Sequence, residues 1–136
     1  MRLFASPLYV GLAAILLIVL SVNVMRVRGR YKVGIGDGGH VELARAMRVQ
    51  ANFVEYVPIA LLLLLCVDLV GDAKWIVHVL GILLLVGRVF HAYGLSRSSD
   101  ETFGRAAGTV LTFLVLIVGA VLAILGTFQI RILAPA

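Results

Sequence analysis

The sequence predicts an all-α membrane protein, in which a single domain of residues 1–136 forms a bundle of four transmembrane helices. Its hydrophobic share of 62% and mean hydropathy of +1.09 exceed what one soluble core of this size can hide, since soluble domains are about 45–50% apolar. Four apolar segments each reach the roughly 20 residues that a helix needs to cross about 30 Å of hydrocarbon. Apolar and polar residues do not alternate along these segments, which argues against a membrane β-barrel.

The first apolar segment, Leu3–Met25, carries no charged residue. It is longer than the apolar part of a signal peptide, which has about 7–15 residues, and no Ala-x-Ala cleavage motif follows it. Arg26, Arg28, Arg30 and Lys32 come next, as in the flank of a stop-transfer segment. We therefore expect a retained spanning helix followed by a basic loop.

Three further segments predict the remaining helices: Val41–Val70, Lys74–Leu95 and Arg105–Ile130. The first loop contains GDGG at Gly36–Gly39, a turn signal that depends on the ability of glycine to adopt positive φ. Gly71-Asp72 marks the second turn, and the stretch GLSRSSDETFG forms the third loop. The connections between the four segments are therefore short.

The charge pattern predicts an orientation in the membrane and argues against nucleic acid as a partner. The net charge is +5 and the pI about 10.0, but the basic residues flank apolar segments and form no groove interleaved with aromatic residues. The first loop holds most of the Lys and Arg, whereas the opposite side has Arg2, Lys74 and Arg131, offset by Asp68 and Asp72. The positive-inside bias therefore places loops one and three in the cytoplasm, with both termini across the membrane.

Cysteine and histidine give no sign of a disulfide or of a metal site. The chain has one cysteine, Cys66, which lies in an apolar run. The three histidines have no metal-binding spacing, and the sequence contains neither a cysteine pair nor an HExxH motif. We therefore expect no metal cofactor.

A polar stripe interrupts the second segment. At about 100° per residue, Arg48, Asn52 and Glu55 fall within roughly 60° of one another, and Arg45 and Tyr56 extend the stripe. An ionisable side chain inside a membrane costs about 2.5–3.5 kcal/mol, so these residues should face the bundle interior or a partner, and an Arg48–Glu55 pair would reduce the cost. The alternative is that both arginines extend to the membrane interface while Glu55 is neutralised internally.

Three other polar residues bear on the same region. Gln50 points to the opposite side of the second segment from Arg48. In the stretch GRVFHAYG of the third segment, Arg88 and His91 are three residues apart and share a helical face. The alternative reading of His91 is a hydrogen-bonded residue of helix packing.

Two motifs make the chain similar to the MAPEG family, the membrane-associated proteins in eicosanoid and glutathione metabolism. RVQANFVEYVP, Arg48–Pro58, resembles the R-x-Q-x-N-x-x-E-Y-x-P element of the family's second helix, and GRVFHAYG, Gly87–Gly94, resembles the third-helix element of its small bacterial branch. Four helices, chain length and a basic first loop extend the resemblance over nearly the whole chain. The resemblance implies a homotrimer in a bacterial inner membrane, with glutathione bound between adjacent protomers near the cytoplasmic face.

The resemblance also implies which residues bind glutathione. Arginine forks suit its two carboxylates, and Glu55 suits its ammonium group. Gln50, on the opposite face, would serve the site of the neighbouring protomer, and Arg26 or Arg28 would add a carboxylate contact. The glutathione-binding residues implied in this way are Arg48, Asn52, Glu55, Tyr56, Gln50, Arg28, Arg26, Arg88 and His91.

The chain departs from eicosanoid-forming relatives at positions that concern catalysis. Those relatives have tyrosines where this chain has His91 and Leu95, and an arginine after the third helix that stabilises the glutathione thiolate. At the matching spacing this chain has Thr102, with Arg97 before it and Arg105 after it. Arg105 is the candidate catalytic residue, and the alternative is that it anchors the fourth helix at the cytoplasmic interface.

Three functions are compatible with these patterns. The first is a glutathione transferase or peroxidase that acts on small lipophilic electrophiles dissolved in membrane lipid and lowers the thiol pKa from its ordinary value of about 8.5. The second is a non-catalytic binding or structural protein of the same fold. The third is a small proton-coupled exporter, although such exporters typically carry a carboxylate in the first helix, which has none here.

Overall fold

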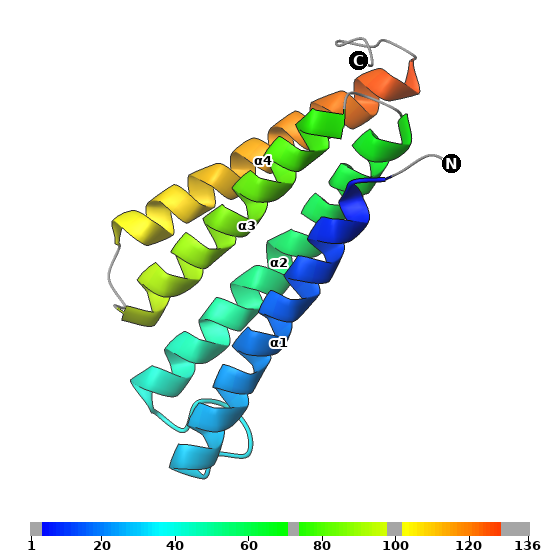
Figure 1. The fold of residues 1–136 in the computed structure, drawn as a ribbon. Coiled ribbons are helices and arrows are strands. Elements are labelled where there is room, and N and C mark those ends of the chain that lie inside the picture. The colour runs from blue at the N-terminus through cyan, green and yellow to red at the C-terminus, as the bar shows by residue number, and fades with distance from the viewer. Residues whose placement is uncertain (1–3, 71–73, 98–101, 129–136) are drawn as a thin grey trace.

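Four long helices make up the fold. The computed structural model describes residues 4–70, 74–97 and 102–128, which contain α1 (Ser6–Tyr31), α2 (Val41–Val70), α3 (Lys74–Arg97) and α4 (Phe103–Thr127) (Figure 1). Each of these helices is long and apolar enough to cross a membrane. The predicted fold class, a bundle of four transmembrane helices, is therefore confirmed.

The first helix is longer than the sequence analysis predicted. It continues past Met25 to Tyr31, so the three arginines of RVRGR lie on its last turns, and the prediction that they belong to the loop was wrong. Arginine is a good helix former, and a cation suits the negative end of the helix dipole. The helix ends at Lys32, which adopts a left-handed conformation with φ 54°.

The other helix boundaries lie close to the predicted ones. α2 spans the predicted range, and α3 ends at Arg97, shortly after the predicted Leu95. α4 begins at Phe103, where Thr102 caps the helix by accepting a hydrogen bond from the N–H of Arg105 at 3.4 Å. Several positions used in the sequence analysis fall outside the described residues, namely Arg2, Leu3, Gly71, Asp72, Ile130 and Arg131.

The loop between α1 and α2 turns through its glycines, as predicted. Gly36, Gly38 and Gly39 have φ angles of 71°, 59° and 77°, which residues with a side chain rarely adopt. Asp37 closes the turn, because its Oδ1 accepts a hydrogen bond from the N–H of Gly39 at 2.9 Å and its carbonyl accepts one from the N–H of His40 at 3.0 Å. The loop therefore has a defined shape next to the start of α2.

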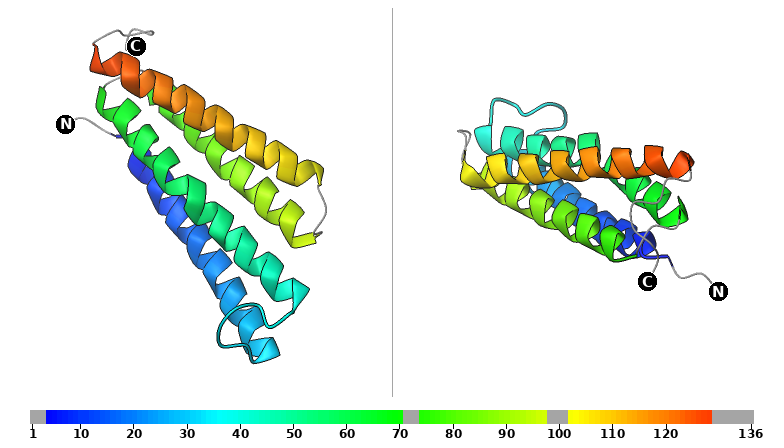
Figure 2. Two further views of the ribbon diagram at one scale, coloured as in Figure 1. Left: turned by 180° about the vertical axis from the view of Figure 1, so that it is seen from behind. Right: turned by 90° about the horizontal axis from the view of Figure 1, so that it is seen from above.

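The helices pair as two hairpins, α1 with α2 and α3 with α4. The hairpins lie together where α1 begins and α2 ends, and they diverge toward the end where α1 ends and α2 begins (Figures 1 and 2). We call the first of these the closed end and the second the open end. The loop described above lies at the open end.

The main hydrophobic core lies toward the closed end and draws on all four helices. Its buried members are Ala5, Tyr9, Ala60, Leu64, Val67, Ile76, Val77, Leu80, Leu84, Val115 and Leu122. At the open end, the cluster of Val24, Val27, Leu43 and Ala46 joins α1 to α2. Apolar packing between the two hairpins is therefore concentrated away from the open end.

Tyr9 of α1 connects the two hairpins within this core. It is 3% exposed, and its hydroxyl lies 2.8 Å from Nδ1 of His78 and donates to the His78 carbonyl at 3.1 Å. Gly81, about one turn further along α3, provides the space, because a Cβ there would collide with the Tyr9 ring. These contacts account for a phenol within an otherwise apolar part of α1.

Asp68 is buried near the closed end of α2, where it caps α1. Its Oδ2 accepts hydrogen bonds from the backbone N–H groups of Ala5 and Ser6, both at 2.7 Å. The first amides of a helix have no partner within that helix, and a carboxylate also suits the positive end of its dipole. The sequence analysis counted Asp68 as a surface charge, whereas the structure gives it this structural role.

Candidate functional site

A cavity of about 390 Å³ lies at the open end and is lined from both hairpins. Arg45, Arg48 and Asn52 of α2 line it, together with His91 of α3 and Arg105 of α4. Spacings of three and four residues place the α2 side chains on one helical face. The sequence analysis selected Arg48, Asn52, His91 and Arg105 as site residues, and the fold brings these four to one place.

The loop between α1 and α2 forms another wall of the same cavity. Asp37, Gly39 and His40 line it, and the sequence analysis gave none of them a functional role. Loop residues lack the helical periodicity that identified the polar stripe. The available signal was the position of this loop directly before the polar stripe of α2.

Arg28 holds this loop in place. Its Nη1 donates to the carbonyls of Val33, Gly34 and Gly36 at 3.3, 3.2 and 3.0 Å. An irregular turn does not supply a backbone N–H partner for each of its carbonyls, and the Arg28 side chain donates to three of them. Arg26 is exposed on α1, and neither Arg26 nor Arg28 is among the described residues that line the cavity. Their contact with glutathione stays a prediction.

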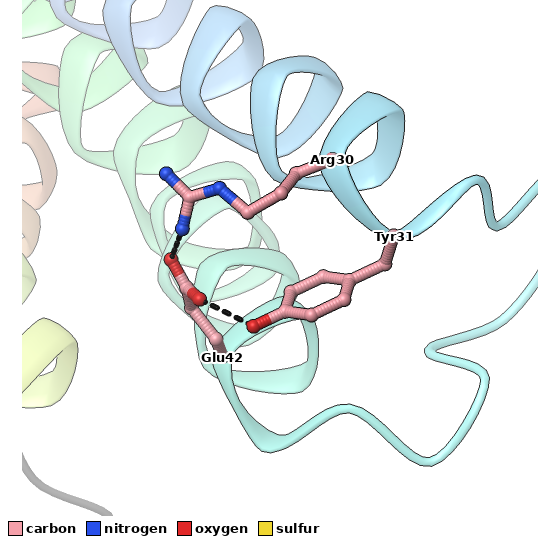
Figure 3. A network of polar contacts seen from close by, with 3 residues as sticks. All are labelled: Arg30, Tyr31 and Glu42. Carbon is pink, nitrogen blue, oxygen red and sulfur yellow. Dashed lines mark hydrogen bonds and ion pairs between the residues drawn. The ribbon is translucent and has the colours of Figure 1, made fainter.

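A polar network beside the loop joins the end of α1 to the start of α2 (Figure 3). Glu42 accepts hydrogen bonds from Arg30 at 2.8 Å and from the Tyr31 hydroxyl at 2.7 Å. The Tyr31 ring stacks on His40, with ring centroids 4.1 Å apart. Because the Arg30 and Glu42 side chains are about half exposed, solvent screens their ion pair, and its main effect is to position the cavity wall at His40.

Arg88 is buried behind the cavity and holds Asn52. It is 3% exposed, its Nη1 donates to Oδ1 of Asn52 at 2.7 Å, and its Nη2 donates to the carbonyl of Gly108 at 3.4 Å. Its guanidinium carbon also lies 5.9 Å from the centre of the Tyr56 ring. Since Oδ1 of Asn52 is occupied, the amide NH₂ is the part of this side chain that remains to donate to a ligand.

Gly108 allows α3 and α4 to approach closely at this level. A Cβ at this position would collide with the carbonyl oxygen of Gly87 and would lie 2.7 Å from the backbone nitrogen of His91. The close approach brings the Gly108 carbonyl within reach of Arg88, and the same carbonyl accepts a second hydrogen bond from Thr112 at 2.8 Å. A small residue on α4 is thus needed to position the buried arginine.

A second cavity of about 390 Å³ adjoins the first. The two share Asn52, His91 and Arg105, and the remaining lining of the second comes from the next turns of α4. Val110 on that wall is 65% exposed, so this cavity reaches the outer apolar surface of the protomer. Arg105 therefore lies where a polar cavity meets one that opens toward the lipid-facing side.

Arg48 and Glu55 form the pair that the sequence analysis suggested. Their closest atoms are 3.9 Å apart, and their side chains are 66% and 49% exposed. Glu55 and Tyr56 lie outside the lining of the first cavity, and the Tyr56 ring packs against Phe113 of α4 with centroids 5.7 Å apart. The polar stripe therefore divides into Arg45, Arg48 and Asn52, which line the cavity, and Glu55 and Tyr56, which do not.

Gln50 lies on the α1 side of α2. Helical spacing predicted only that it points away from Arg48. Its Nε2 donates to Oγ of Ser21 at 2.7 Å, and Ser21 in turn donates to the Leu17 carbonyl at 2.8 Å. The amide thus has a partner within its own chain. Its role in the site of a neighbouring protomer stays a prediction.

The open end is rich in cations whose hydrogen-bonding capacity is incompletely used. Nη1 of Arg45 donates to the carbonyl of Arg97 at 3.3 Å. The Nε atoms of Arg45 and Arg88 are buried and have no partner in the described part of the chain. A cavity with this surrounding favours an anionic ligand with several acceptor atoms.

The described part of the chain offers no cluster of metal ligands and one exposed thiol. Residues 4–70, 74–97 and 102–128 contain no group of three or more His, Cys, Asp or Glu side chains that could hold a metal ion. Cys66 is exposed on α2 and lines a third cavity of about 380 Å³ between α2 and α4, whose other walls are mainly apolar. This third cavity offers little chemistry besides a thiol.

Known proteins are similar to this chain over most of its length. The family model described as MAPEG family matches residues 6–125. "Inner membrane protein YecN" of Escherichia coli (strain K12) is 48% identical over 89 residues, which cover 65% of this chain and 68% of YecN. "Uncharacterized protein sll1147" of Synechocystis sp. is 34% identical over 126 residues, which cover 91% of this chain and 90% of that protein.

Proposed function

Because this chain belongs to the MAPEG family, we propose that it is an inner-membrane protein that binds glutathione and uses its thiolate to conjugate or reduce small lipophilic electrophiles. This is the activity of a glutathione transferase or peroxidase. Four helices that can span a membrane and the similarity to YecN support the location. Glutathione serves as the co-substrate, and the proposed chemistry needs no metal.

One observation carries the proposal: Arg45, Arg48 and Arg105 line a single cavity at the open end. In its reactive form, glutathione bears three negative groups, which are two carboxylates and a thiolate. The guanidinium group of arginine presents paired N–H donors that match a carboxylate. The cavity volume of about 390 Å³ also lies within the range of about 300–1,000 Å³ that is usual for small-molecule sites.

The three arginines and Asn52 of the cavity each have a part in this proposal. Arg45 and Arg48 bind the carboxylates, and the amide NH₂ of Asn52 donates to the peptide of glutathione. Arg88 acts through Asn52 as a positioning residue, because its hydrogen bond at 2.7 Å fixes the orientation of that amide. Arg105 lies at the junction of the two cavities, where the sulfur would meet the electrophile.

A cation beside the sulfur supplies the chemistry. It stabilises the thiolate and lowers the thiol pKa of bound glutathione below its ordinary value of about 8.5. The thiol proton leaves to solvent, the sulfur electron pair forms a bond to the electrophilic carbon, and the leaving group departs with the electron pair of the broken bond. With a lipid hydroperoxide, two glutathione molecules are oxidised to the disulfide while the peroxide is reduced to an alcohol and water.

The second cavity provides a place for the electrophile. It shares Arg105 and His91 with the first cavity and opens beside Val110 on the apolar outer surface. A lipophilic molecule dissolved in the bilayer can approach the sulfur from this side without crossing water. Binding of the two reactants in adjoining cavities would raise their effective concentration.

The proposal includes a homotrimer with loops one and three in the cytoplasm. The side chains of Arg48 and Glu55 are 66% and 49% exposed in the single protomer, and contact with hydrocarbon would cost about 2.5–3.5 kcal/mol for each charge. A neighbouring protomer that covers these side chains removes that cost. The basic residues near the open end support the cytoplasmic orientation.

A non-catalytic glutathione-binding protein of the same fold is the second candidate. Leu95 lines the first cavity and offers no hydrogen bond to a sulfur or to a substrate. If Arg105 serves as an anchor of α4 at the membrane interface, the bound thiol keeps its ordinary pKa. This candidate shares the binding step with the first and lacks the turnover.

Calorimetric titration of glutathione into the full-length protein in mild detergent tests the proposal, together with turnover of an aryl halide. We expect Arg48→Ala to lose at least tenfold in affinity, because a charge-assisted hydrogen bond contributes about 1.5–3 kcal/mol. Arg97→Ala is the matched control, because it also removes one arginine at the open end. The Arg97 side chain lies over the Tyr93 ring and does not line the described cavity. Wild-type affinity in Arg48→Ala, or an equal loss in both variants, would contradict the proposed site. Binding without turnover would select the second candidate.

A further inference from the structure

His91 of α3 lies at the junction of the two adjoining cavities. It is 7% exposed, and it lines both cavities together with Asn52 and Arg105. The backbone of α4 packs directly against it, because a Cβ at Gly108 would lie only 2.7 Å from the Cβ of His91. The imidazole therefore starts from a fixed point between the polar cavity and the one that opens toward the lipid-facing side.

The His91 ring has hydrogen-bonding capacity that the protomer leaves unused. Neither ring nitrogen has a hydrogen-bond partner among residues 4–70, 74–97 and 102–128, and neither is fully buried. Since so little of the residue is exposed, these nitrogens open onto the cavities that His91 lines. A neutral imidazole has a donor N–H on one nitrogen and an acceptor on the other. The ring can therefore give a proton on one side and take one on the other.

The two reactions proposed for the bound thiolate differ in what the leaving group needs. A halide displaced from an aryl halide departs as a stable anion and takes no proton. When the sulfur attacks the terminal oxygen of a hydroperoxide, the O–O bond breaks and its electron pair leaves on an alkoxide, which needs a proton to become the alcohol. Arg105 can stabilise the negative charge but cannot give the proton, because a guanidinium group stays protonated in proteins.

The second cavity also fits a molecule with an apolar body and a polar reactive end. Val110 on its outer side is 65% exposed, whereas Asn52, His91 and Arg105 lie at its junction with the first cavity. An acyl chain that carries a hydroperoxide group has this division. Its O–O bond would then lie beside the sulfur and the His91 ring.

We propose that His91 gives the proton to the alkoxide, an inference that rests on the proposed glutathione chemistry and selects lipid hydroperoxides as the electrophile class. As the O–O bond breaks, one ring N–H protonates the alkoxide, and the other ring nitrogen takes a proton from solvent in the first cavity. The sulfur retains the hydroxyl oxygen. The thiolate of a second glutathione displaces that oxygen, which leaves as water after gaining a proton from solvent, and the disulfide forms.

Turnover of two electrophiles by the same proteins tests this role. Cumene hydroperoxide and chlorodinitrobenzene are each reacted with glutathione in wild type, His91→Gln and His78→Gln, all as full-length protein in mild detergent. Glutamine can donate a hydrogen bond but does not transfer protons as an imidazole does. His78→Gln is the matched control, because it makes the same substitution in the same helix at a residue outside the lining of both cavities.

We expect His91→Gln to lose about a hundredfold in kcat for cumene hydroperoxide, since a general acid typically contributes about 10²–10⁴-fold. Its kcat for chlorodinitrobenzene and its calorimetric affinity for glutathione should stay within about threefold of wild type. His78→Gln should keep the wild-type ratio of the two rates. Equal losses for both electrophiles in His91→Gln would make His91 a positioning residue, and retained hydroperoxide turnover would remove it from the reaction. Either result, or the same selective loss in His78→Gln, would overturn the proposal.

The wild-type protein separates the two possible failures. If it conjugates chlorodinitrobenzene but does not reduce cumene hydroperoxide, the role of His91 fails while the proposed transferase activity stands. If it turns over neither electrophile, the proposed catalytic function fails, and the role of His91 fails with it.

Discussion

The closed and open ends of the bundle differ in which buried polar groups lack hydrogen-bond partners. At the closed end, the carboxylate of Asp68 and the hydroxyl of Tyr9 have short hydrogen bonds, and Ser6 Oγ is a buried hydroxyl without a partner among the described residues. At the open end, the fully buried polar atoms without a partner in the same part of the chain belong to the guanidinium groups of Arg45 and Arg88. Unused donors are thus a hydroxyl at one end and cations at the other.

Packing follows the same division. The core of all four helices lies toward the closed end, whereas the hairpins diverge at the open end (Figures 1 and 2). Two adjoining cavities lie between the hairpins at the open end. Stability and ligand recognition are therefore expected to depend on different ends of the same helices. Substitutions can separate the two by changing one property while leaving the other in place.

The largest effect on stability is expected from Leu64→Ala in the closed-end core. Leu64 is 0% exposed, and removal of a buried leucine side chain typically costs about 2–5 kcal/mol through lost contacts and the resulting cavity. The thermal unfolding temperature in detergent should fall, while glutathione affinity below that temperature stays within about twofold. Leu62→Ala, which truncates an exposed leucine of the same helix, is the control and should leave the unfolding temperature almost unchanged. A large loss of affinity in Leu64→Ala with unchanged unfolding would reverse the assigned roles of the two ends.

At the open end, Arg88→Met should change affinity and stability in different directions. Methionine fills much of the same space but leaves Asn52 without its hydrogen bond, so glutathione affinity should fall by about 1–3 kcal/mol. Replacement of a buried charge by an apolar side chain is often neutral or stabilising, so the unfolding temperature should stay the same or rise. Calorimetry and thermal unfolding on one preparation measure both quantities. Retained affinity would show that Asn52 needs no positioning by Arg88.

A smaller effect is expected from Asp68→Ala, because it removes the cap of α1 at the closed end. Loss of a helix cap typically costs about 0.5–2 kcal/mol, and the backbone amides of Ala5 and Ser6 would lose their acceptor. The unfolding temperature should fall less than in Leu64→Ala. Hydrogen exchange at the first turn of α1 should quicken in the variant, and unchanged exchange there would argue against the cap.

The smallest effect is expected from Arg28→Ala, which loosens the loop between α1 and α2. The three carbonyls that Arg28 bonds would turn to water, so global stability should change by less than about 1 kcal/mol. Hydrogen exchange over residues 33–40 should increase, and glutathione affinity should fall a few-fold because the loop that forms one wall of the cavity is less well positioned. Arg26→Ala, which removes an exposed arginine of the same helix, should leave exchange in the loop unchanged. Equal loop exchange in Arg28→Ala and wild type would show that Arg28 does not hold the loop.

The division between the two ends also explains what the sequence could predict. Long apolar segments fix the number and approximate limits of the helices, and helical spacing identifies Arg48 and Asn52 as neighbours. His91 and Arg105 were added from motif resemblance and position, and the fold places them with the α2 residues in one cavity. Periodic and motif-bearing parts of the site were therefore predictable.

Residues whose role depends on tertiary contacts were missed or assigned differently. Asp37 and His40 lie in a loop, where no periodicity indicates which wall they form. Asp68 has the sequence signature of a surface charge, and only the packing of α1 against the end of α2 shows that it is a cap. The resemblance implies that Arg28 contacts the ligand, which stays a prediction, and its bonds to loop carbonyls could not be predicted because they depend on how the chain turns after α1.

Ultraviolet absorbance of the glutathione thiolate, followed against pH at saturating glutathione, tests most directly whether the open-end cavity binds and ionises this thiol. In wild type the thiolate should form at a pH at least one unit below that of free glutathione, which corresponds to about 1.4 kcal/mol of stabilisation. In Arg105→Ala the thiolate should form near the pH of the free thiol, while calorimetric affinity for glutathione is largely retained. A wild-type titration that coincides with that of free glutathione would contradict the proposed catalytic role of this cavity.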